Sequence, residues 1–81
     1  MQNQRPADVT LKRIDPDLNM HRFYRMSLQR DLFGRTSLIR EWGRIGRRGQ
    51  MLIETHEEET EAREAMVTLE RTKQKRGYRV S

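Results

Sequence analysis

The amino-acid sequence predicts an α+β fold, in which a four-stranded antiparallel β-sheet (a meander) carries one C-terminal α-helix on one face. Three observations lead to this prediction. Residues 9–56 alternate between apolar and polar side chains with short turns between, and from residue 60 the period changes to 3.6. The chain has only 81 residues, of which 33% are hydrophobic, so one sheet and one helix are about all it can pack. We expect a single domain over residues 9–81 after a polar, disordered leader over residues 1–8.

The first two strands are expected over residues 9–15 and 22–29. Proline fixes φ and lacks a backbone donor, so Pro16 ends the first strand, and residues 17–21 form a loop. Three apolar side chains share one face of the second strand, namely Tyr24, Met26 and Leu28. Residues 31–35 are expected to form the turn to the third strand.

The third strand, over residues 37–45, has two different faces. Trp42 shares one face with Arg40 and Arg44, whereas Ile39 and Ile45 lie on the other. We expect the two isoleucines to seat the helix and the indole to look outward with the arginines. Residues 46–49 then form a hairpin turn, where glycine at both flanks tolerates positive φ, and the fourth strand runs over residues 50–56.

The helix is expected from about residue 60. Thr60 is one candidate N-cap, and a capping box of Thr55 with Glu58 is the alternative. Gly77 is the stop signal, and residues 78–80 are expected to return as a short edge strand. The apolar stripe that should face the sheet consists of Ala62, Ala65, Met66 and Leu69, extended by Thr72 or Lys73.

Composition narrows the possible functions. The chain has no cysteine, which excludes disulfides and zinc–thiolate sites and is compatible with a reducing cytoplasm. No apolar run is long enough for a signal peptide or a membrane span. His56 precedes three glutamates, but Thr60 stands where a helical zinc motif needs histidine. We therefore expect no metal, no cofactor, no membrane contact and no catalytic residues.

The charge of the chain is strongly basic, with a net value of +5. A basic surface can serve solubility alone or can bind a polyanion. Fourteen of the seventeen basic residues are arginine. Guanidinium groups match phosphate in shape and also stack on rings, so the preference for arginine favours a nucleic-acid partner.

The candidate site is the segment from Arg40 to Gly49, which contains the single tryptophan. Trp42 is interpretable as a core residue, as a stacking platform for a sugar or base, or as a ring covered by its neighbouring arginines. Arg47 and Arg48, at the hairpin tip, are either solvated or bind phosphate oxygens together with free backbone amides.

The segment Trp42-Gly43-Arg44-Ile45-Gly46, followed by Gly49-Gln50, resembles the signature of the WGR domain family. The resemblance covers about residues 9–80. The segment from Arg22 to Leu28 resembles the aromatic strand of the family, and Ala65 with Gly77-Tyr78 resembles its helix and helix exit. This family is known as a module of DNA-dependent poly(ADP-ribose) polymerases and as small stand-alone or fused bacterial proteins.

The resemblance implies a sheet with one helix and binding of nucleic acid. In the polymerases the motif tryptophan stacks near a sugar at a DNA strand end, and the motif arginine contacts the backbone and other domains. These roles would fall on Trp42 and Arg44, with further contacts from Arg22 and from Lys73 or Lys75. No transferase domain is present in the 81 residues, so the resemblance implies no enzymatic activity.

The sequence thus predicts a monomeric, non-enzymatic nucleic-acid-binding module, with DNA as the expected partner. A protein–protein interaction adaptor that uses the same Trp/Arg face is the alternative. The residues expected to bind nucleic acid are Trp42, Gly43, Arg44, Arg40, Arg47, Arg48, Arg22, Lys73 and Lys75.

Overall fold

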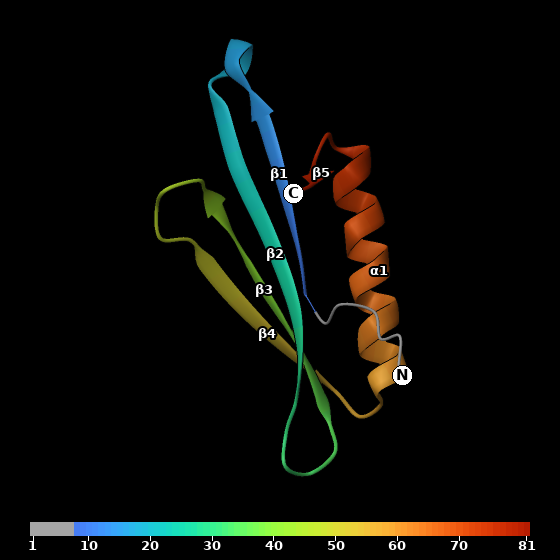
Figure 1. Ribbon diagram of the computed structural model, residues 1–81. Helices are drawn as coiled ribbons and strands as arrows, with labels where there is room; N and C mark the ends of the chain where they lie inside the picture. The colour runs from blue at the N-terminus through green and yellow to red at the C-terminus, as the bar shows by residue number, and fades with distance from the viewer. Residues whose placement is uncertain (1–7) are drawn as a thin grey trace, which may run out of the picture.

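The computed structural model describes residues 8–81, which form one antiparallel sheet with a helix across one face (Figure 1). The elements are β1 (Asp8–Asp15), the 3₁₀ helix η1 (Pro16–Leu18), β2 (Met20–Arg30), β3 (Thr36–Arg44), β4 (Gln50–His56), α1 (Glu59–Lys75) and β5 (Arg79–Val80). The strand order is β4-β3-β2-β1-β5. The predicted α+β meander is confirmed, and the expected short strand after the helix pairs with β1. The expected leader lies outside the described residues except for Asp8, where β1 begins.

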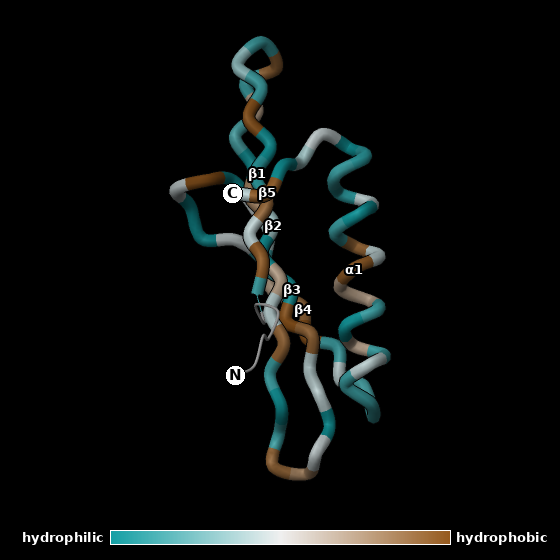
Figure 2. The backbone as a smooth tube through the Cα atoms, turned by 45° about the vertical axis from the view of Figure 1, so that its right-hand side comes forward, coloured by the Kyte–Doolittle hydropathy of each residue, from teal (hydrophilic) through white to brown (hydrophobic). Residues whose placement is uncertain are grey.

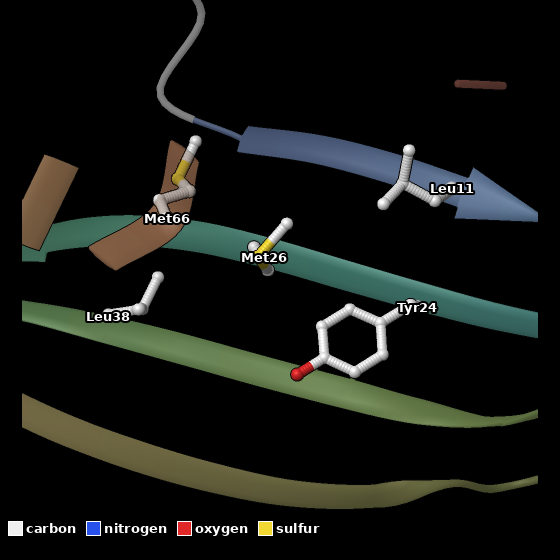
Figure 3. Close-up of a cluster of buried hydrophobic side chains, with 5 residues drawn as sticks. All are labelled: Leu11, Tyr24, Met26, Leu38 and Met66. Atoms are coloured by element: carbon white, nitrogen blue, oxygen red, sulfur yellow. The ribbon is translucent and has the colours of Figure 1, made fainter. Parts of the chain in front are cut away.

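The buried core lies between α1 and the central strands (Figure 3). Alternation along β1, β2 and β3 brings one apolar row from each strand to the helix-bearing face, and α1 contributes the predicted stripe. The buried hydrophobic residues are Leu11, Tyr24, Met26, Leu38, Ala62 and Met66. Val9, Leu28, Trp42, Ala65, Leu69 and Tyr78 are partly buried against the cluster of these side chains. A core of six buried side chains is small, so each of them matters for stability.

The prediction of which face of β3 carries the helix is wrong. Leu38 and Trp42 lie on the helix-bearing face, and Ile39 and Ile45 lie on the helix-free face, where Ile39 pairs with Ile53 of β4. The alternation itself is as predicted, but both faces of β3 carry apolar side chains. The choice between them is made by β2, because Leu38 and Trp42 lie opposite Leu28 and Tyr24 of its apolar row.

The start of α1 differs from the prediction, whereas its end agrees with it. Glu58 is the N-cap, without a side-chain hydrogen bond, so neither Thr60 nor the box of Thr55 with Glu58 caps the helix. The Thr55 hydroxyl instead lies 3.2 Å from that of Ser37 within the sheet. At the other end Gly77 has φ +96°, and the amide of Tyr78 donates to the Lys73 carbonyl at 3.0 Å. Gly77 thus ends the helix as predicted, by taking a left-handed conformation.

The β2–β3 turn is ordered by one carboxylate. Asp31 accepts hydrogen bonds from the amides of Phe33 and Arg35 at 2.8 and 2.9 Å, and from the Arg35 side chain at 2.9 Å. Partial loss of hydration opposes the effect, but these hydrogen bonds lower the pKa of Asp31. Leu32 and Phe33 are 98% and 82% exposed at the tip, where Figure 2 shows a hydrophobic end to the hairpin.

Replacing Leu38, which is fully buried, with alanine should lower the free energy of unfolding by about 2–5 kcal/mol. The loss comes from removed apolar contacts and from the cavity left behind. Urea denaturation followed by circular dichroism measures it. Ile53→Ala is the control, since Ile53 is 55% exposed on the helix-free face, and it should cost much less. Equal losses for the two variants would contradict the assignment of the core.

Candidate nucleic-acid interface

Three aromatic side chains meet on the helix-bearing face, around Tyr24. Trp42 lies opposite Tyr24 in the β2–β3 pairing, and the two rings stack with centroids 6.0 Å apart and planes inclined by 18°. Tyr78, which follows the helix, meets Tyr24 edge-on at 6.4 Å. Trp42 is only partly buried, so the indole both packs on the core and leaves surface for a ligand.

Arg40 links this aromatic cluster of Trp42, Tyr24 and Tyr78 to β4. Its Nε donates to the Tyr24 hydroxyl at 2.8 Å, and its Nη1 pairs with Glu54 at 2.8 Å. Its guanidinium carbon lies 5.9 Å from the Trp42 ring centre. Partial burial acts against the charged form, but the bonds to Tyr24 and Glu54 raise the pKa of Arg40 above its ordinary value. Arg40 is thus a permanent cation beside the indole, fixed in place by its hydrogen bonds to Tyr24 and Glu54.

Lys73 reaches the same cluster from the helix. Its Nζ lies 4.5 Å from the centre of the Tyr24 ring and 5.7 Å from that of Tyr78. Within residues 8–81 this ammonium group has no carboxylate partner. Burial, together with the charges of Arg76 and Arg40, lowers the pKa of Lys73. An anion placed here would relieve that repulsion.

A row of three arginines lies beside the aromatic cluster. Arg13, Arg22 and Arg44 are directly paired across β1, β2 and β3, one step along from Leu11, Tyr24 and Trp42 on the same face. None of the three forms an ion pair with a residue in the described part of the chain. Arg44 only donates weakly to Asn19, at 3.4 Å. Three cations without carboxylate partners give this part of the face a concentrated positive charge.

Arg13, Tyr24 and Tyr78 also belong to this surface, although the sequence pattern does not single them out as site residues. Arg13 follows Leu11 by two residues, so the alternation alone puts it on the core face of β1. Its position next to Arg22 depends on the β1–β2 register, which the sequence pattern does not specify. If β1 and β2 are paired symmetrically about the short η1 turn, Arg13 falls opposite Arg22.

Gly43 and Gly49 have structural roles on the helix-free face. A Cβ on Gly43 would lie 2.9 Å from the Gly49 Cα and 3.5 Å from the Phe23 ring, and one on Gly49 would collide with the Trp42 carbonyl. These two glycines let the β3–β4 hairpin close tightly against Phe23. The expectation of positive φ at both flanks of the hairpin is wrong for Gly49, because of the two only Gly46 has it, at +88°.

The predicted site residues are therefore divided between two faces. Trp42, Arg40, Arg44, Arg22 and Lys73 lie together around Tyr24 on the helix-bearing face. Arg47 and Arg48 instead line a hollow on the helix-free face, where Gly43 also lies. Lys75 is exposed at the end of α1, where none of the contacts described above involves it.

Among residues 8–81, no group of three histidine, cysteine or acidic side chains could hold a metal ion. No helix in this part of the chain is both long enough and apolar enough to cross a membrane.

Removing a neighbouring charge should raise the pKa of Lys73. We expect this for Arg76→Gln, because the repulsion that disfavours the ammonium form becomes weaker. The folded-state pKa lies below the unfolded value, so the penalty on folding exists at neutral pH and is relieved as the pH rises through the lowered pKa. NMR titration of the Lys73 side chain measures the change. Arg71→Gln, an equal charge change on an exposed residue, is the control, and an equal rise there would refute the local origin.

Comparison with known proteins gives the family. The WGR domain family model matches residues 7–81. An uncharacterized protein, y4dW, of Sinorhizobium fredii (strain NBRC 101917 / NGR234) is 45% identical over 74 residues, which cover 91% of this chain and 36% of that protein. The chain thus spans about a third of the length of this relative. No solved structure matches the chain. With the Trp-Gly-Arg segment in a β3–β4 hairpin and one helix on the sheet, the chain belongs to the WGR domain family.

Proposed function

We propose that this chain is a non-catalytic DNA-binding module whose contact surface is the helix-bearing face around Trp42. Membership of the WGR family supports a nucleic-acid-binding role at a coarse level. The observation that carries the finer proposal is the row of Arg13, Arg22 and Arg44 beside the stacked Trp42 and Tyr24 rings. An aromatic platform next to cations without carboxylate partners suits a sugar–phosphate chain.

In this proposal each part of the surface has a separate task. The exposed part of the Trp42 ring stacks on a sugar or a terminal base. The three arginines lie on strands spaced about 4.8 Å apart and contact phosphate oxygens. Lys73 supplies a further cation from the helix end. Such contacts carry little base information, so binding should have low sequence specificity.

The proposal includes a setting for the module. We place it in the cytoplasm, because a chain without cysteine needs no oxidising compartment, and we treat the free protein as a monomer. Any activity that the module serves would come from other polypeptide segments or partners. A protein ligand on the same face remains the competing interpretation, and the experiments below separate the two.

Trp42→Ala should weaken binding to a short blunt-ended duplex by about 1–3 kcal/mol, the usual contribution of one stacked aromatic side chain. Fluorescence anisotropy of a labelled duplex measures the affinity. Because Trp42 also packs on the core, urea denaturation must show that the variant is folded under the assay conditions. Ile53→Ala, on the helix-free face, is the matched control. Unchanged duplex affinity in a folded Trp42→Ala protein would refute the stacking role.

The double variant Arg22→Gln and Arg44→Gln should reduce the slope of log affinity against log salt by about 1.8, since each phosphate contact contributes about 0.9 for duplex DNA. The same anisotropy assay, repeated over a range of salt concentrations, gives the slope. Arg30→Gln with Arg71→Gln removes the same charge elsewhere and should change it much less. Equal changes would indicate diffuse attraction, and no duplex binding by the unmodified chain would favour a protein partner.

A further inference from the structure

We infer that the helix-free face carries a second, separate binding site, which takes a nucleoside phosphate. The site is a hollow of about 590 Å³ between the β3–β4 hairpin and the strands β1 and β2. In Figures 1 and 2 the loop between β3 and β4 projects on the side of the sheet away from α1. This volume is within the range of pockets that hold small organic ligands.

The hollow has a fixed shape because the hairpin is tied to the sheet. The amide of Ile45 donates to the His21 carbonyl on β2 at 2.8 Å, and that of Arg47 donates to the Arg44 carbonyl at 3.0 Å. Gly43 and Gly49 allow the two sides of the hairpin to approach the Phe23 ring closely. The site is therefore largely formed before a ligand arrives, which reduces the entropic cost of binding.

The charges around the hollow favour an anion. Its lining contains four cations and one carboxylate, Glu41. Glu41 is already paired with Arg25 at 3.3 Å. Lys12, Arg47 and Arg48 have no ion-pair partner among residues 8–81, so three positive charges converge on the hollow without compensation. A phosphate group between them would gain charge-assisted hydrogen bonds.

The lining of the hollow also includes apolar and aromatic side chains, which indicates more than a bare phosphate. Phe23, partly buried, lines it together with Ile45 and the exposed Met51. The guanidinium of Arg25 lies 5.6 Å from the Phe23 ring centre, where Glu41 holds it. A planar base can stack on this guanidinium or on the ring while its phosphate reaches Arg47 and Arg48. A nucleoside phosphate matches both the cationic and the aromatic lining residues.

This second site does not depend on the proposed function. It uses β1 and β2 side chains that alternate with those of the Trp42 surface, so the sheet separates the two sites and both can be occupied together. The glycines at 43 and 49 explain the tight hairpin, but they do not explain why two arginines and Lys12 surround the hollow.

An NMR titration of the full chain with ADP, pyrophosphate and adenosine, at matched ionic strength, tests the inference. ADP should shift the amide signals of Phe23, Arg47 and Arg48 saturably, and should bind about tenfold more tightly than pyrophosphate or adenosine. Arg47→Gln with Arg48→Gln should weaken ADP binding by about tenfold or more. Arg22→Gln with Arg44→Gln, an equal charge change on the other face, should change it by less than about twofold.

Phe23→Leu keeps an apolar side chain and removes the aromatic ring, so it should weaken ADP binding while leaving pyrophosphate binding unchanged. Three results would overturn the inference. These are no saturable shift at millimolar ADP, equal affinity for ADP and pyrophosphate, and equal losses in the two double-arginine variants. Duplex affinity measured on the same proteins keeps this test distinct, because the proposed DNA surface is judged by the duplex binding of the unmodified chain and of the Trp42 and Arg22/Arg44 variants, and ADP binding does not enter that judgement.

Discussion

The buried phenol of Tyr24 connects the core of this domain to its surface. The side chain is 2% exposed and packs among apolar residues, so its hydroxyl needs a partner inside the protein. Arg40 provides that partner, and in doing so a permanent cation is held next to Trp42. The same phenol ring stacks with the indole of Trp42, and the Lys73 ammonium lies over it. The candidate interface is therefore an extension of the core and is as rigid as the packing beneath it.

Three consecutive residues, Trp42, Gly43 and Arg44, illustrate how a strand divides tasks between two faces. Alternation places the indole and the guanidinium on the helix-bearing face, where they join a stacked cluster and a row of cations. It places the glycine on the other face, where the absence of a Cβ lets the hairpin close on Phe23. One short segment thus shapes both surfaces of the sheet, which explains why its residues cannot be assigned to a single role.

The strands and the helix could be predicted from local periods, because alternation and the 3.6-residue stripe depend only on neighbouring residues. The covered face of β3 could not, since Ile39 and Leu38 are equally apolar and the choice rests on pairing with β2. The same holds for the candidate site. Trp42, Arg40 and Arg44 share one strand, so alternation alone predicts that they lie on one face, whereas Arg13 joins them through the β1–β2 register. Arg47 and Arg48 are neighbours of this group in the sequence, but they lie beyond the end of β3 and line the hollow on the helix-free face.

The conformation of the β2–β3 turn does not depend on the side chains at its tip. One carboxylate and the local backbone determine its conformation, and Leu32 and Phe33 contribute almost no buried area. Sequence change at these two positions is consequently free of the volume constraints that govern the core. This end of the molecule can therefore be apolar or polar in relatives. The sheet, the helix and both faces of the sheet need not change with it.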